Sequence, residues 1–128
     1  MQTTKMAIAC AVRKKAVSYF KNPDLDETCA IVSFALKKSF KLSKFKADVF
    51  SGFFDGFCHC WLQSDDKIWD LTAAQFSCDY PEIIVTDLTD KRYLGGKKVS
   101  VKDFKYWISS QKPRPSVVKK IISGGKIK

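Results

Sequence analysis

The chain has 128 residues, of which 45% are hydrophobic and 13% aromatic, enough for one hydrophobic core and too few for two ordinary domains. The formal net charge is +10, but residues 1–90 hold 11 basic and 12 acidic side chains, whereas residues 91–128 hold 12 basic and one acidic. No apolar run approaches the ~20 residues that cross a bilayer, so we expect no membrane span.

The N-terminus and the cysteines bear on the compartment. Residues 1–10 lack the basic flank and the apolar stretch of a signal peptide. An odd number of cysteines in a chain without an export signal argues against a disulfide framework. We therefore expect an intracellular, cytoplasmic protein without a cofactor, whose five cysteines are free thiols: Cys10, Cys29, Cys58, Cys60 and Cys78.

Two helices are predicted in the first third of the chain. Apolar residues recur every three or four positions over residues 4–20, and Asn22-Pro23 would end that helix. The stripe consists of Met6, Ala9, Val12, Ala16 and Tyr19 or Phe20. A second helix is predicted from Asp26 to Phe40, because acidic residues precede its apolar stretch and lysines follow it, as the helix dipole favours. Cys29 then lies in the first turn or just beyond.

Short aromatic and β-branched runs follow, which predict three antiparallel strands over residues 46–54, 57–63 and 67–71, and a further strand is expected over residues 82–86. Asp55-Gly56 is a strong signal for a two-residue hairpin turn. Gly95-Gly96 is interpreted as another turn. Ser100, with Asp103 three residues later, predicts a helix through Trp107 and Ile108, and Pro113 and Pro115 separate it from a short helix ending at Gly124.

These elements predict an α+β fold with a helix packed on a small antiparallel sheet. We expect one domain over residues 1–128, with a core at about 22–90 and a basic, helical C-terminal segment at 91–128.

Three residues carry the chemistry that the pattern suggests. Cysteine nucleophiles need a thiolate, a nearby imidazole and a group that orients the imidazole. A thiol at a helix N-terminus is stabilised as the thiolate, and Cys29 is the one cysteine placed that way. His59 is the sole histidine, and Asp70 is an acidic residue in an apolar strand that calls for a polar partner.

Strand register brings His59 and Asp70 together in either of two arrangements. If Ser64 and Asp65 form the turn, His59 lies opposite Asp70; if Asp65 and Asp66 form it, Asp70 lies opposite Trp61, on the same face. Counting across the first hairpin pairs His59 with Gly52, which predicts open space beside the imidazole.

The order of a helix-start cysteine, a strand histidine and a next-strand aspartate resembles the transglutaminase-type core of the papain-like superfamily. The runs His59-Cys60-Trp61-Leu62 and Asp70-Leu71-Thr72-Ala73-Ala74-Gln75-Phe76 resemble small stand-alone bacterial and phage proteins of that kind, over residues 24–78. The resemblance implies Cys29 as nucleophile, His59 as base and Asp70 as orienting residue. The implied reaction is acyl transfer from amides or esters of a peptide or protein substrate: hydrolysis, deamidation or transamidation.

The family's oxyanion donor is missing, since no Gln stands shortly before Cys29. The backbone N–H of Cys29 is the natural first donor, and Gln75 or the Trp61 indole are candidates for the second.

Alternatives remain for several of these residues. Cys58-His59-Cys60 does not form a metal site on a regular strand, because adjacent side chains point to opposite faces, so core packing is expected for Cys58 and Cys60. Core and hairpin packing is also expected for the aromatics, some of which are candidates to line a substrate groove: Phe50, Phe53, Phe54 and Phe57. The alternative function is a non-catalytic binding module whose basic C-terminal third docks an anionic partner such as nucleic acid, with Lys119 and Lys120 as contacts.

Overall fold

The computed structural model describes residues 4–25, 28–100 and 102–103, and in these residues the fold is α+β. Two α-helices, α1 and α2, accompany a five-stranded antiparallel sheet with strand order β4-β3-β2-β1-β5. The helices are α1 (Lys5–Phe20), α2 (Cys29–Leu42) and the 3-10 helix η1 (Ala73–Gln75). The strands are β1 (Asp48–Phe54), β2 (Phe57–Ser64), β3 (Lys67–Asp70), β4 (Ile84–Asp87) and β5 (Tyr93–Lys98).

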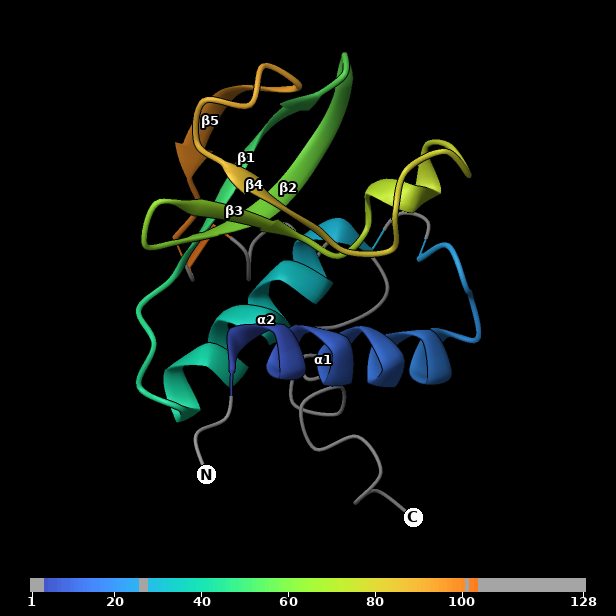
Figure 1. The fold of residues 1–128 in the computed structure, drawn as a ribbon, viewed down its shortest axis with the longest axis vertical. Helices are drawn as coiled ribbons and strands as arrows, with labels where there is room; N and C mark the ends of the chain where they lie inside the picture. Colours follow the sequence, from blue (N-terminus) through green and yellow to red (C-terminus); the bar gives the residue numbers. More distant parts are fainter. Residues whose placement is uncertain (1–3, 26–27, 101, 104–128) are drawn as a thin grey trace.

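The sheet separates two hydrophobic clusters. Figure 1 shows both long helices on one side of the sheet, with α2 running obliquely beneath the strands and α1 packed against α2. The first cluster fills the space between helices and sheet and includes Leu36, Leu62 and Trp69. The second lies on the opposite face around Phe54 and Trp61, and Ala73, Phe76 and Tyr80 from the segment that begins with η1 pack into it.

Helix α1 forms as the sequence predicts. The Thr4 side chain caps it by accepting a hydrogen bond from the Ala7 N–H at 3.1 Å. Its buried face is centred differently from the predicted stripe, because Met6 and Tyr19 are exposed while Ile8 is buried. The remaining buried apolar positions are Ala9, Val12 and Ala16.

Arg13 ties α1 to the end of β3. Its guanidinium is buried and donates to the carbonyls of Leu71 at 3.0 Å and Pro23 at 2.9 Å. Because both are backbone acceptors, these bonds position the chain immediately after Asp70 relative to the helices.

Both predicted hairpins are present, and one register is selected for each. Asp55 and Gly56 have φ of 46° and 86°, as a primed two-residue turn requires, and Gly52 pairs with His59 as predicted. In the second hairpin Asp65 and Asp66 form the turn, so Leu62 pairs with Trp69. The second of the two predicted registers is therefore correct.

The prediction of a turn at Gly95-Gly96 is wrong, because both glycines lie in β5, which pairs with β1. Glycine is required there by close packing at one position and by the backbone conformation at the other. A Cβ on Gly96 would stand 3.0 Å from the Trp61 ring, and Gly95 has a φ of 66° where the β1–β5 register shifts.

The open space predicted beside Gly52 is also absent. A Cβ at Gly52 would lie 2.5 Å from the Leu94 carbonyl oxygen and 2.8 Å from the Trp61 ring. Gly52 thus permits close packing of β5 and Trp61, not access to the imidazole.

The C-terminal predictions fall mainly outside the described residues. The Asp103 N–H bonds to the Ser100 hydroxyl at 3.0 Å, as at the predicted helix start, whereas Trp107, Ile108 and the helix ending at Gly124 lie outside. None of the helices in the described part of the chain has the length and apolar character needed to cross a membrane.

Candidate active site

Asp70 is the centre of a buried polar cluster at the end of β3. Its side chain is fully buried, and its two oxygens accept hydrogen bonds from three separate segments. His59 Nε2 lies 3.0 Å from Oδ1 and 2.9 Å from Oδ2, the Tyr93 hydroxyl donates to Oδ2 at 2.8 Å, and the Thr72 N–H donates to Oδ1 at 3.0 Å. A buried carboxylate requires such partners, because burial without them is costly.

His59 lies on β2 with its side chain fully buried. The described β2–β3 pairing ends at Leu62 and Trp69, so His59 faces the Asp70 side chain where the strand ladder has stopped. With Nε2 directed at Asp70, the other ring nitrogen, Nδ1, is buried and has no hydrogen-bond partner among the described residues. Nδ1 is therefore the nitrogen available to exchange a proton with another group.

Cys29 is the first residue of α2 and is half-buried, so it is the member of the cluster that reaches the surface. The Thr28 hydroxyl donates to the Leu25 carbonyl at 2.6 Å and makes no capping bond to α2. The first N–H groups of the helix, left without that cap, favour a negative charge at Cys29.

Cys60 has the largest effect on the pKa of the Cys29 thiol. It is buried on the helix side of β2, and its hydrogen bond to Cys29 is the largest factor that holds the pKa of the Cys29 thiol well below 9.0. Burial opposes this shift and the nearby His59 reinforces it. The same hydrogen bond, together with burial, raises the pKa of Cys60, so Cys60 keeps its proton and donates it toward the Cys29 thiolate.

The same cluster makes His59 a strong base. Burial disfavours the imidazolium, but the hydrogen bond to Asp70 and the proximity of Cys29 outweigh burial and raise the pKa of His59 from 6.5 to about 9. The two shifts together favour a Cys29 thiolate beside a protonated His59. The Cys29 thiol makes no hydrogen bond to the buried Nδ1 in this structure.

Aromatic side chains seal the imidazole. The rings of Phe54 and Phe76 lie 5.7 Å and 5.0 Å from the His59 ring, between centroids, and Phe57 stacks on Phe76 at 4.6 Å. Phe54 is buried as predicted, whereas Phe57 and Phe53 are about half exposed, 49% and 48%. The exposed face of Phe57 and Phe76 provides an apolar surface beside the site.

The two candidate oxyanion donors differ in their surroundings. The Gln75 amide donates to the Thr72 carbonyl at 2.9 Å, which turns it toward its own 3-10 helix. The Trp61 indole N–H is buried without a hydrogen-bond partner in the described part of the chain. Of the two, Trp61 has the donor that calls for an acceptor.

The outcomes for the other residues singled out in the sequence differ from one another. Cys58 is exposed, so its predicted core role is wrong, while Cys60 is buried as expected. Residues 4–25, 28–100 and 102–103 contain no cluster of three metal-ligating side chains. Lys119 and Lys120 lie outside the described residues.

Tyr93 is the site residue that sequence reasoning missed. Its ring packs between Phe54 and Trp61, at centroid distances of 4.8 Å and 5.0 Å, and its hydroxyl reaches Asp70. Burial raises the pKa of Tyr93, so its hydroxyl stays protonated and donates. The available signal was a tyrosine two residues before Gly95, which indicates β5 only if the glycines are assigned to a strand.

Tyr93→Phe should lower the free energy of unfolding by about 1.5–3 kcal/mol, because it removes a hydrogen bond to a buried carboxylate and leaves the ring packing unchanged. Urea denaturation at neutral pH measures the loss. Tyr80→Phe is the matched control, since the Tyr80 hydroxyl bonds to Asp55 at the surface and its removal should have little effect. Equal losses in the two variants would contradict the role given to Tyr93.

The pH dependence of stability tests the coupling between Cys29 and His59. Between pH 6.5 and 9 the folded chain holds a proton on His59 that the unfolded chain has released, and it lacks the Cys29 proton that the unfolded chain retains. The raised pKa of His59 makes stability fall as pH rises through this window, and the lowered pKa of Cys29 makes it rise. The two effects cancel, so the pair should leave wild-type stability nearly flat.

Cys29→Ala removes one of the two effects. Its free energy of unfolding should decrease as pH rises from 6.5 toward the remaining pKa of His59, by up to about 1.4 kcal/mol per pH unit. Urea denaturation at successive pH values gives both profiles. Parallel profiles for wild type and variant would show that Cys29 is not a thiolate in the folded protein.

Comparisons with known proteins give no relative that bears on this site. No family model, no curated protein and no solved structure matches the chain.

Proposed function

We propose that the chain is a cysteine-dependent acyl-transfer enzyme with Cys29 as nucleophile, His59 as general acid and base, and Asp70 as orienting residue. The observation that carries the proposal is the lowered pKa of a half-buried, helix-start thiol beside an imidazole whose far nitrogen is bound to a buried carboxylate. These are the three requirements of an activated cysteine nucleophile.

The reaction follows from the protonation states. The Cys29 thiolate attacks the carbonyl carbon of an amide or ester, forming a C–S bond, and the carbonyl π electrons move to the oxygen. The His59 Nδ1–H then donates its proton to the departing amine or alcohol, which leaves a thioester on Cys29. Neutral His59 next takes a proton from water or an amine, whose attack breaks the C–S bond and restores the thiolate.

Each supporting group has a distinct task in this cycle. Asp70 keeps Nε2 as the donor and stabilises the imidazolium, so Nδ1 stays directed to the chemistry. The N–H groups at the start of α2 are the first candidates to stabilise the oxyanion, and the Trp61 indole is the second. Tyr93 and Thr72 hold the carboxylate in place.

The fold is consistent with the resemblance noted from the sequence. A papain-like, transglutaminase-type core has its nucleophile at the start of a helix and its imidazole and carboxylate on neighbouring strands. The α+β arrangement of α2, β2 and β3 provides those positions. The substrate class is accordingly a peptide or a side-chain amide of a protein, with hydrolysis, deamidation or transamidation as the outcome.

Thiol labelling tests the proposal. Cys29 should react with iodoacetamide at a rate that is already maximal at pH 7, because its thiolate is formed well below the ordinary cysteine pKa of about 8.5. Mass-spectrometric site assignment across pH separates Cys29 from the exposed Cys10, Cys58 and Cys78. His59→Ala should remove the rapid reaction at neutral pH, and Cys29→Ala should remove labelling at that site and any turnover.

Asp70→Asn tests whether the Asp70 carboxylate orients the His59 imidazole. The amide is nearly the same size but supplies no charge to stabilise the imidazolium, so labelling at pH 7 and turnover should both fall sharply while circular dichroism stays native. If another cysteine labels faster than Cys29 at neutral pH in the wild type, Cys29 is not the nucleophile.

A further inference from the structure

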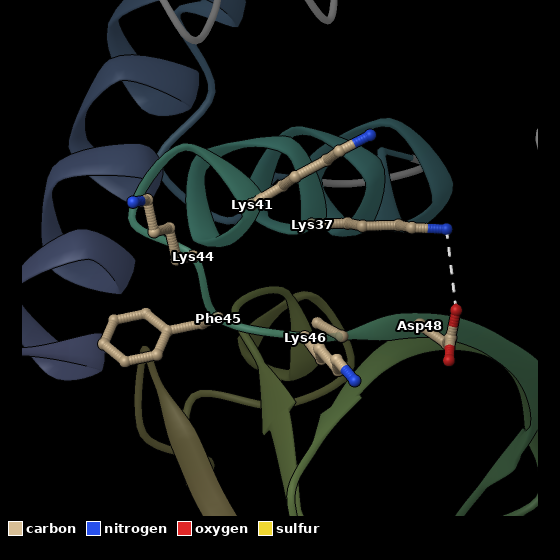
Figure 2. A pocket seen from close by; sticks show the side chains of 7 residues that line it. Lys37, Lys41, Lys44, Phe45, Lys46 and Asp48 are labelled. Atoms are coloured by element: carbon tan, nitrogen blue, oxygen red, sulfur yellow. Dashed lines mark ion pairs between the residues drawn. The ribbon is translucent and has the colours of Figure 1, made fainter.

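A basic hollow lies at the far end of the nucleophile helix. It has a volume of about 420 Å³ and lies between the last turns of α2 and the segment that leads into β1. Figure 2 shows Lys37 and Lys41 extending from α2 on one side, with Lys46 and Asp48 on the other. Lys44 lines it at the turn.

The charge in this hollow is not balanced by its own surroundings. Asp48 is its single acidic lining residue, and it is already paired with Lys37 at 3.6 Å and with Lys98 at 3.4 Å. Lys41, Lys44 and Lys46 are exposed and form no ion pair with the described residues. Three lysines without an ion pair to the described residues therefore line one hollow, whose walls include the apolar Phe45 and Ala47.

The backbone at Lys44 points to a use for its charge. The end of α2 is a Schellman turn, in which the Phe45 N–H bonds to the Phe40 carbonyl and the Lys44 N–H to the Lys41 carbonyl, each at 2.9 Å. Lys44 takes the left-handed position with φ of 65°, where glycine is ordinarily preferred. The helix dipole favours lysines at this end, but it does not account for Lys46, which lies beyond the helix.

We propose that this hollow binds an acidic segment of the protein substrate, and this inference rests on the proposed function. Cys29 and Lys41 stand at opposite ends of α2, twelve residues apart in the helix, which corresponds to about 18 Å. An extended peptide covers ~3.3 Å per residue, so the Asp and Glu side chains lie at least about five residues from the reactive amide.

Acidic peptide fits this surface better than nucleic acid does. Carboxylate side chains on a peptide reach into a concave pocket, and the neighbouring peptide carbons contact its apolar wall at Ala47. A single-stranded nucleic acid would use exposed aromatic rings for base stacking. Phe45, the aromatic residue that lines the hollow, is instead covered by the Lys5 ammonium group, 5.2 Å from its ring centroid.

The test measures binding of a capped, fluorescein-labelled hexaglutamate peptide to the full-length Cys29→Ala protein by fluorescence anisotropy, at about 10 mM ionic strength. The hollow variant carries Lys41→Gln, Lys44→Gln and Lys46→Gln. The control variant carries Lys14→Gln, Lys21→Gln and Lys91→Gln, three exposed lysines elsewhere, so both variants lose the same charge. We expect the hollow variant to bind about tenfold more weakly and the control variant to stay within about threefold of the parent.

Lys44→Gly separates lost charge from lost structure. Glycine relieves the left-handed conformation, so this variant should melt at a higher temperature than the parent and still bind the peptide about twofold more weakly. Equal weakening by the hollow and control variants would overturn the proposal, because net charge alone would then explain the binding. A single-stranded oligonucleotide of the same charge that depends on the hollow lysines more than the peptide does would overturn it in favour of nucleic acid.

The proposed hollow and the proposed enzyme can be rejected independently of each other. Cys29 labelling with iodoacetamide in the hollow variant with Cys29 intact should proceed at the parental rate. If the parent does not bind the peptide although Cys29 labels rapidly, the hollow is rejected and the enzyme stands, whereas slow labelling of Cys29 in the wild type rejects the enzyme.

Discussion

The buried Asp70 carboxylate is the constraint on which the site depends. Removing a charged group from water is favourable only when its oxygens are satisfied, and here β2, β5 and the backbone after β3 each supply a donor. Arg13 strengthens the same region by binding the Leu71 carbonyl from α1. The polar cluster and Arg13 together thereby hold the helices and the sheet in contact at the end of β3.

This cluster also explains how a largely buried site can favour charge separation. Burial alone would neutralise both Cys29 and His59, but Asp70 stabilises the imidazolium on one side, and Cys60 and the start of α2 stabilise the thiolate on the other. The two charges also stabilise each other. The aromatic rings of Phe54 and Phe76 exclude water from the imidazole, which strengthens these interactions.

The elements that a local pattern determines were predictable. Strand side chains alternate with a period of two, so either even-length turn after β2 placed His59 and Asp70 on one face. The sequence did not decide between the two turns, because Asp65 belongs to both of them. Tyr93 was not predictable in this way, since β5 is an edge strand in which Gly96 accommodates the ring of Trp61, a residue distant in the sequence. The contact between Cys29 and Cys60 likewise depends on how α2 packs on the sheet.

The most direct test of the account uses the fact that His59 is the only histidine in the chain. A nitrogen-15 NMR titration of the imidazole therefore reports one residue without assignment ambiguity. We expect a doubly protonated ring at pH 7 that titrates near 9 in the wild type, and a lower pKa of His59 in Cys29→Ala because the thiolate is gone. A ring that titrates near 6.5 in both proteins would contradict the thiolate–imidazolium pair.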